Sequence, residues 1–240
     1  MTLPRLQMFL HQAASGLAAM HRKKIAHLDV KLENMLLTDH QTLKVADFGH
    51  ATEYIGPHPS QRRSIGSANW RAPEIYDHRE GVGPGYDSFK ADVWSLGCAA
   101  YFLAVGHHPF AELELRTPLP DLDEYKEFAA AQASGNSGAA AVCTFFGIHE
   151  SRWQRLAPRV QQLIDGCLQI PPARRWSLQQ VLGALDALDS LEPPAEQTRA
   201  DGPLLEDEDD ERPVYRCANA PPTSRRAPPQ HLRTRGGTFV

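Results

Sequence analysis

The sequence predicts an α+β fold that is mostly helical, with a few short strands in its N-terminal third. Apolar residues recur with helical periodicity in several long segments, whereas the strand-like patterns are short apolar runs bounded by turn residues. The stretch VWSLGCAAYFLAVG, residues 93–106, is almost continuously apolar yet too short to cross a bilayer, so it predicts a buried helix. With 42% hydrophobic residues in a chain of 240, a sizeable core can form around that helix.

The first elements follow from local patterns. Residues 5–21 carry apolar side chains three and four positions apart, which predicts an amphipathic helix. KIAHLDV (24–30) and NMLLTDHQTLKVADFG (34–49) then predict short strands and loops, with TDHQT as a turn between two apolar runs. The stretch 60–71 is polar and rich in Ser and Arg without periodicity, which predicts a long loop.

The rest of the chain is expected to be helical up to a change in composition. Helices are predicted at 89–104, 120–133, 156–168 and 177–190, the last with Ser177 as its cap. After Leu191 the chain is rich in Pro and charge and poor in periodic apolar residues, so it cannot bury enough surface to offset the entropy of ordering. We therefore predict one folded domain at 1–191 and a disordered tail at 192–240 that is available for partner binding.

Composition excludes several classes of function. The formal charge is −4, from 25 basic and 29 acidic residues, which offers no general attraction to nucleic acid or to an anionic membrane. The four cysteines lie far apart and lack zinc-ligand spacing, which favours reduced thiols in an intracellular compartment. The opening MTLPRLQMFLHQ does not resemble a signal peptide, so the expected location is cytoplasmic.

Four polar residues within a short, otherwise apolar region point to one kind of chemistry. Asp29, Lys31 and Asn34 lie within HLDVKLEN, and Asp47 follows thirteen residues after Asn34. A carboxylate can accept a proton from an attacking hydroxyl, an ammonium group can hold a phosphoryl group, and amide and carboxylate oxygens suit Mg²⁺. The pattern predicts phosphoryl transfer from a magnesium–nucleotide complex.

Several motifs in chain order resemble the eukaryotic-type protein kinase family. HLDVKLEN resembles its catalytic loop, DFG (47–49) its metal-binding motif, GSANWRAPE (66–74) the end of its activation segment, and KADVWSLG (90–97) its central buried helix. The resemblance covers about residues 3–190. It implies a Ser/Thr protein kinase that uses ATP and Mg²⁺ and acts on a protein substrate with a Ser or Thr acceptor, and a protein-kinase-like fold of which this chain carries the helical C-terminal lobe.

The resemblance also assigns roles to individual residues. Asp29 is implied as the catalytic base and Lys31 as the phosphate-holding cation. Asn34 and Asp47 are implied as Mg²⁺ ligands, and Leu36 as the floor under the adenine ring. The remaining residues have structural or substrate-loop roles: His27 and Phe48 in a hydrophobic stack, Ser67 on the Asp29/Lys31 pair, Asp92 as a cap of the catalytic loop, and Glu74 paired with Arg175.

Two departures from the family pattern qualify these roles. Leu28 stands where the family usually has the arginine that binds a phosphorylated activation loop, so we expect no clamp at that position. No glycine-rich phosphate loop or strand lysine precedes the catalytic loop, so the N-terminal lobe is expected to be absent from this chain. The alternative function is a non-catalytic, kinase-like docking module. His107 and His108 are expected to be surface loop residues.

Overall fold

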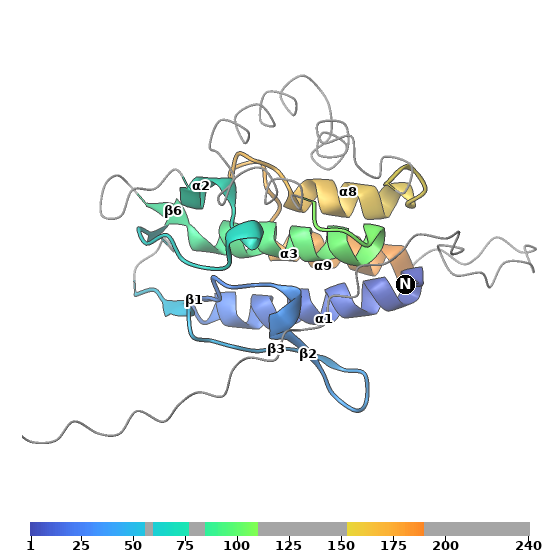
Figure 1. The fold of residues 1–240 in the computed structure, drawn as a ribbon, viewed down its shortest axis with the longest axis horizontal. Helices are drawn as coiled ribbons and strands as arrows, with labels where there is room; N and C mark the ends of the chain where they lie inside the picture. The colour runs from blue at the N-terminus through green and yellow to red at the C-terminus, as the bar shows by residue number, and fades with distance from the viewer. Residues whose placement is uncertain (56–59, 77–84, 110–152, 190–240) are drawn as a thin grey trace, which may run out of the picture. The chain divides into compact units, whose positions relative to one another are not determined.

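The helices form by burying one face each, as their periodicity predicts. The computed structural model describes residues 1–55, 60–76, 85–109 and 153–189. Helix α1 (Leu3–Arg22) buries the side chains that recur along it at helical spacing, namely Leu6, Phe9, Leu10, Ala13, Ala14 and Leu17. It packs against α3 and α9 and against strand β3 (Figure 1). The predicted helix at 5–21 is therefore present, with two additional residues at its N-terminus and one at its C-terminus.

Helix α3 (Ser88–Val105) is the centre of the fold. It is buried on nearly every side, as the apolar stretch at 93–106 predicts, and contacts α1, α8 and β1 (Figure 1). Asp87 caps its start by accepting the N–H groups of Phe89 and Lys90, and Gly106 ends it in the left-handed conformation with φ 91°. A central helix held at both ends gives the surrounding elements a rigid base.

Helices α8 (Pro158–Cys167) and α9 (Leu178–Asp189) complete the helical layer. Ser177 caps α9 as predicted: its hydroxyl accepts the N–H of Gln180, and the Gln180 amide oxygen accepts the N–H of Ser177 in return. Helix α2 (Pro73–Tyr76) is a single short turn. The helix predicted at 120–133 and the tail predicted at 192–240 lie outside the described residues.

The strands are short and pair in three antiparallel ladders. β1 (Ile25–Ala26) pairs with β4 (Thr52–Glu53), β2 (Met35–Leu37) with β3 (Leu43–Val45), and β5 (Ser60–Gln61) with β6 (Tyr86–Asp87). The β2–β3 hairpin turns through residues 38–42, where the sequence predicts a turn. The stretch predicted as one long loop at 60–71 instead begins with β5 and contains a 3₁₀ turn at Ala68–Trp70.

The space around Gly166 differs from the space around Gly183, so alanine at the two positions should change stability in opposite directions. A methyl group at Gly166 would lie 2.2 Å from the Trp176 ring, whereas one at Gly183 would meet nothing within 4 Å. We expect Gly166→Ala to lower the free energy of unfolding by about 1–3 kcal/mol through overpacking. Gly183→Ala, in the interior of α9, is expected to raise it by about 0.5–1 kcal/mol. Urea unfolding of both variants checks this, and equal effects at the two sites would contradict it.

His108 departs from the surface position expected for it. Its ring packs edge-on against Trp70, with 4.8 Å between ring centroids, and burial lowers the pKa of the imidazole from 6.5 to about 4. The unfolded chain therefore takes up a proton at this residue before the folded protein does. As a result, the contribution of His108 to the free energy of unfolding is fully present above pH 6.5 and is lost as the pH falls towards 4.

The burial of His108 predicts that the free energy of unfolding depends on pH, and replacing His108 should remove that dependence. We expect the free energy of unfolding to fall by about 2 kcal/mol between pH 7.5 and pH 4.5 because of His108. His108→Gln should flatten that slope, whereas His107→Gln, at an exposed neighbouring position, should leave it unchanged. Urea unfolding at both pH values measures the slope, and an equal slope in wild type and His108→Gln would exclude this histidine as its source.

Candidate active site

A carboxylate on α3 holds the backbone of the segment that carries the predicted acid. Asp92 is 1% exposed, and its two oxygens accept the N–H groups of His27 and Leu28, each at 2.8 Å. The predicted cap by Asp92 is therefore present. The ring of His21 adds a third contact, with Nε2 2.8 Å from Asp92 Oδ2. Local spacing could not indicate this contact, because 71 residues separate the two side chains.

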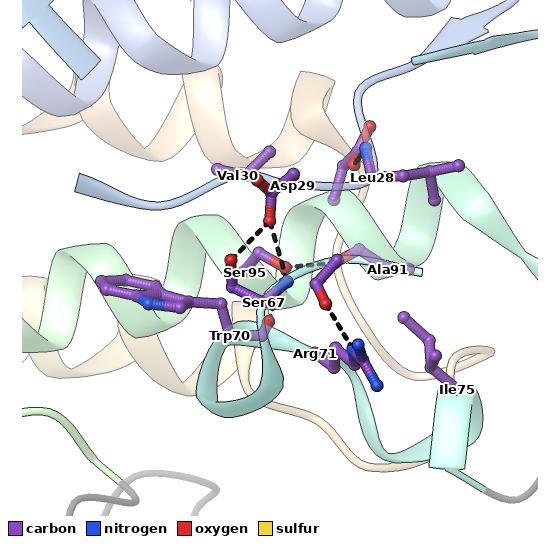
Figure 2. A pocket seen from close by; sticks show the side chains of 11 residues that line it. Leu28, Asp29, Val30, Ser67, Trp70, Arg71, Ile75, Ala91 and Ser95 are labelled. Carbon is purple, nitrogen blue, oxygen red and sulfur yellow. Dashed lines mark hydrogen bonds between the residues drawn. The ribbon is translucent and has the colours of Figure 1, made fainter. Parts of the chain in front are cut away.

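Asp29 lies at the centre of a polar cluster built by two segments, its own and the one that carries Ser67. Its Oδ1 accepts both the backbone N–H and the hydroxyl of Ser67, each at 2.8 Å, and Figure 2 shows the carboxylate directed at that serine. Its Oδ2 lies 3.0 Å from Lys31 Nζ. Lys31 Nζ also donates to Ser67 Oγ at 2.8 Å. Acid, cation and hydroxyl thus form a closed triangle, although Ser67 lies 38 residues along the chain from Asp29.

The surroundings of Asp29 keep it ionised. Burial by itself raises the pKa of this carboxyl, but hydrogen bonds from Lys31 and Ser67, together with the Lys31 charge, outweigh burial and lower the pKa below 3.8. The side chain is 5% exposed and that of Lys31 is 22% exposed, so the pair is only partly screened by solvent. At neutral pH Asp29 is a carboxylate that accepts hydrogen bonds.

The Asn34 side chain is oriented by the same carboxylate. Its Nδ2 donates to the backbone oxygen of Asp29 at 2.8 Å and to Oδ2 at 3.1 Å. Both contacts use the amide nitrogen, so they leave Oδ1 as the atom that could bind a cation. A neutral oxygen is a ligand type that Mg²⁺ accepts. The Asn34 side-chain oxygen therefore fits Mg²⁺, the metal that the resemblance implies.

The β2–β3 hairpin carries Asp47 towards the same region. The N–H of Ala46 donates to the backbone oxygen of Asn34 at 2.8 Å, which extends the hairpin by one pair and places Asp47 directly after it. Asp47 is exposed and adopts the left-handed conformation with φ 58°, and its Oδ1 accepts the N–H of Gly49 at 3.2 Å. Asn34 and Asp47 thus lie at the same end of one hairpin.

His27 connects the segment that carries Asp29 to the segment around Asp47. The N–H of Asp29 donates to Nδ1 at 3.3 Å, so Nε2 must carry the hydrogen that the carbonyl of Ala46 accepts at 3.0 Å. The Phe48 ring lies 5.7 Å from the His27 ring between centroids. The rings are tilted by 53°, and His27 is fully buried whereas Phe48 is 56% exposed, so this contact is open on one side. Leu36, on β2, is also largely open, at 55% exposed.

A small cavity lies behind Asp29. Its volume is about 10 Å³, and Asp29, Ser67, Trp70 and Arg71 are among the residues that line it (Figure 2). That volume holds about one water molecule and no nucleotide. Within the part of the chain described, His, Cys, Asp and Glu nowhere cluster in threes suited to a metal.

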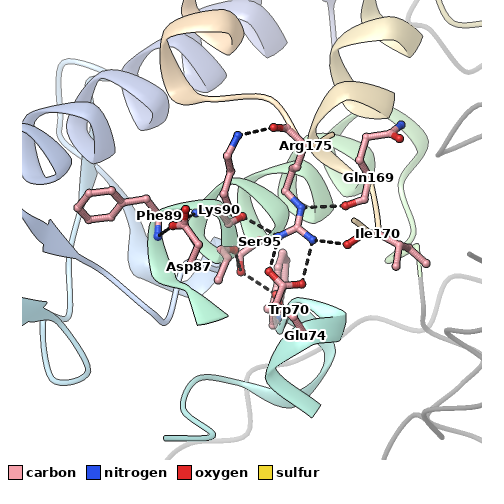
Figure 3. A network of polar contacts seen from close by, with 10 residues as sticks. Trp70, Glu74, Asp87, Phe89, Lys90, Ser95, Gln169, Ile170 and Arg175 are labelled. Carbon is pink, nitrogen blue, oxygen red and sulfur yellow. Dashed lines mark hydrogen bonds and ion pairs between the residues drawn. The ribbon is translucent and has the colours of Figure 1, made fainter. Parts of the chain in front are cut away.

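The predicted pair of Glu74 and Arg175 is present. Arg175 Nη1 and Nη2 donate to Glu74 Oε1 and Oε2 at 2.6 and 2.9 Å (Figure 3). The guanidinium also donates to three backbone carbonyls, those of Lys90, Gln169 and Ile170, and lies over the Trp94 ring. The pair therefore joins α2, α3 and the loop before α9, which is a structural role.

The comparisons with known proteins agree with these motifs. The family model described as protein kinase domain matches residues 1–184. The probable serine/threonine-protein kinase CCRP1 of Zea mays is 29% identical over 74% of this chain and 24% of its own length. The serine/threonine-protein kinase PLK4 of Drosophila virilis is 32% identical over 72% of this chain and 18% of its own length.

A third relative, the serine/threonine-protein kinase chk1 of Schizosaccharomyces pombe, is 32% identical over 73% of this chain and 31% of its own length. The chain thus spans less than a third of the length of each of these relatives. None of the helices described is both long and apolar enough to pass through a membrane. By its family-model match and its similarity to these serine/threonine kinases, the chain belongs to the eukaryotic-type protein kinase family.

Proposed function

We propose that this chain carries the catalytic centre of a serine/threonine protein kinase that transfers the γ-phosphoryl group of ATP to protein hydroxyls. One observation carries the proposal: Asp29, Lys31 and Ser67 form a closed triangle of contacts no longer than 3.0 Å. A purely structural segment has no need to bring a carboxylate, an ammonium group and a hydroxyl together in a partly buried cluster. Family membership supports the same reaction class.

In this proposal Asp29 orients the attacking hydroxyl and accepts its proton. Its low pKa makes it a weak base, which suits phosphoryl transfer because the loose transition state releases that proton late. The carboxylate then acts mainly by fixing the direction of the hydroxyl. The backbone held by Asp92 keeps Asp29 in place for this role.

Lys31 and Ser67 complete the acceptor side. Lys31 supplies a positive charge beside the position at which the phosphoryl group is transferred, and it is held there by Asp29 and Ser67. Ser67 joins the substrate-binding segment to the catalytic carboxylate through its N–H and its hydroxyl. The segment 66–71 can therefore place an acceptor relative to Asp29.

Asn34 and Asp47 are the proposed ligands of Mg²⁺, and Leu36 the proposed contact of the adenine ring. When bound, Mg²⁺ neutralises charge on the transferring phosphoryl group. Asn34 is positioned by Asp29, and Asp47 by the hairpin end. The large exposed fractions of Leu36 and Phe48 support a further part of the proposal, namely that a covering N-terminal lobe is needed for full activity.

A radiolabelled transfer assay tests the proposal. The reaction contains Mg²⁺, γ-labelled ATP and peptides with a Ser, Thr or Tyr acceptor, and compares this chain with a version extended by a protein kinase N-terminal lobe in front of Met1. We expect label on the Ser and Thr peptides with the extended version, and at least about 10³-fold less with the 240-residue chain, as the proposed need for a covering lobe implies. No transfer by either protein would contradict the proposal.

The exposed apolar residues favour one alternative, a kinase-like docking module. Leu36, Leu37 and Phe48 are each about half exposed and lie close to the candidate site. A docking module would bind a partner through them and would be unaffected by Lys31→Met. A kinase would lose transfer with Lys31→Met, so that variant separates the two functions.

A cytoplasmic location and partner binding through residues 192–240 are further parts of the proposal. The cytoplasmic location is supported by the free, buried thiols of Cys98 and Cys167.

A further inference from the structure

The β2–β3 hairpin has a backbone N–H group that its own ladder cannot use. The N–H of Thr38 donates to the backbone oxygen of Thr42 at 2.9 Å, and bonded and non-bonded pairs alternate along an antiparallel ladder. The next pair, Leu37 and Leu43, is therefore of the non-bonded kind, and the N–H of Leu43 points away from β2. Because Leu43 is only 7% exposed, that N–H needs a partner within the protein.

Gln12, on α1, is that partner. Its side-chain oxygen Oε1 accepts the N–H of Leu43 at 2.6 Å, across 31 positions of sequence. The bond is partly buried, so water competes for it poorly, and removing the acceptor would leave a buried N–H without a partner. Helix α1 thereby fixes the first residue of β3.

The face of α1 that carries Gln12 makes further contacts with β3 and the turn before it. Gly16 lies four positions after Gln12 and Arg5 seven positions before it, so the three residues share one face of the helix. A methyl group at Gly16 would lie 3.1 Å from Val45 Cγ2, which shows how closely the helix approaches the strand. Arg5 Nη2 donates to the side-chain oxygen of Gln41 at 2.8 Å. The Gln12 bond thus lies between two other contacts along the same line.

The position of β3 decides where Asp47 lies relative to Asn34. Only Ala46 separates Asp47 from Val45, the last residue of β3. Asn34 is held separately, because its side-chain amide donates to the backbone oxygen of Asp29 at 2.8 Å. A shift of β3 along or away from α1 would therefore move Asp47 while Asn34 stayed with Asp29. The spacing of the two proposed Mg²⁺ ligands thus depends on where α1 holds β3.

We propose that Gln12 is a positioning residue for the Mg²⁺ site, which it serves by fixing β3 to α1 and so setting Asp47 relative to Asn34. This inference rests on the proposed function, in which Asn34 and Asp47 are the metal ligands. Groups that orient metal ligands commonly contribute about 10–100-fold to metal affinity. Mg²⁺ is sensitive to displaced ligands because it requires nearly ideal octahedral geometry.

A magnesium titration followed by NMR tests the proposal without any turnover. The 240-residue chain is titrated with Mg²⁺ alone. The amide signal of Gly49 is the readout, because its N–H donates to Asp47 Oδ1 at 3.2 Å. A signal from one residue reports this site even though the acidic run at 206–211 also offers carboxylates to the metal.

Substitutions of Gln12 should change the Mg²⁺ dissociation constant according to whether an accepting oxygen remains. Gln12→Met keeps the length of the side chain but loses that oxygen, so we expect the constant to rise about 10-fold. Gln12→Glu retains an accepting oxygen and should stay close to wild type. Gly16→Ala, which presses on Val45 instead, disturbs the same contact by a different route and should also raise the constant.

Gln7→Met is the matched control. Gln7 lies on the same helix, but its amide nitrogen donates to the backbone oxygen of Leu185 at 2.9 Å, so the substitution removes a bond to α9 and none to the hairpin. Its Mg²⁺ dissociation constant should equal that of wild type. Asp47→Asn, which removes the charge of the proposed ligand itself, should weaken binding more than Gln12→Met does.

The outcomes separate this inference from the proposed function. If Asp47→Asn weakens Mg²⁺ binding and Gln12→Met does not, the positioning role of Gln12 is overturned while the proposed ligands stand. An equal loss in Gln12→Met and Gln7→Met would also overturn that role, because a general loosening of α1 would explain both. If Asp47→Asn binds Mg²⁺ as wild type does, the proposed ligand itself is wrong, and the role of Gln12 is overturned with it.

Discussion

Asparagine in place of Asp29 is expected to lower the rate of phosphoryl transfer by about 10²–10⁴-fold, measured in the extended version of the chain used in the transfer assay. The substitution keeps the shape of the side chain but removes the charge that binds Lys31 at 3.0 Å. It also introduces an amide nitrogen that cannot accept the hydrogen bond donated by Asn34. The acceptor hydroxyl then loses the group that orients it, while the segment held by Asp92 remains in place.

The measurement is the initial rate of label transfer from γ-labelled ATP at saturating peptide. Asp39→Asn is the matched control, because Asp39 is an exposed turn acid and the same chemical change there should leave the rate unchanged. A transfer rate in Asp29→Asn within about threefold of wild type would remove Asp29 from the proposed mechanism.

The same variant has a predicted pH signature in its stability. The folded-state pKa of Asp29 is lowered, so the carboxylate stabilises the fold above about pH 4 and this contribution is lost as the pH falls through the folded pKa. The difference in free energy of unfolding between wild type and Asp29→Asn should therefore be present at pH 7 and shrink below pH 4. Urea unfolding of wild type and Asp29→Asn at pH 7 and below pH 4 measures whether this difference shrinks.

Removing the buried guanidinium of Arg175 is expected to have the largest effect on stability. Arg175→Met should lower the free energy of unfolding by about 3–5 kcal/mol, because it leaves the Glu74 carboxylate and three backbone carbonyls without their donor. Arg175 is 1% exposed, so water cannot readily replace those bonds. A loss of that size is a large share of the total stability of a domain.

Arg174 provides the matched control for this prediction. It directly precedes Arg175 but is exposed, so Arg174→Met should change the free energy of unfolding by less than about 0.5 kcal/mol. Urea unfolding of both variants and of Glu74→Gln gives the comparison. If Arg175→Met and Arg174→Met had equal free energies of unfolding, the Arg175 network in Figure 3 would not stabilise the fold as we infer.

Local sequence patterns were sufficient for α1, α3, α8, α9 and the β2–β3 hairpin. The spacing of Leu6, Leu10 and Leu17 predicts α1, and Ser177 predicts the start of α9, because amphipathic periodicity and capping act over one or two turns. The order of the kinase-like motifs also led to the family, which the family model confirms. The contacts of Asp29 with Ser67 and of Glu74 with Arg175 came from that resemblance, since no local rule links residues 38 and 101 positions apart.

Other features were decided by tertiary structure alone. Packing of α1 against α3 brings His21 to Asp92, and a ring contact with Trp70 accompanies the partial burial of His108, which was expected at the surface. The contact of Arg71 with Ser64 depends on how the segment after β5 folds back on itself. These contacts depend on where separate elements meet in space, and a one-dimensional pattern records which face of an element is apolar without recording which partner covers it.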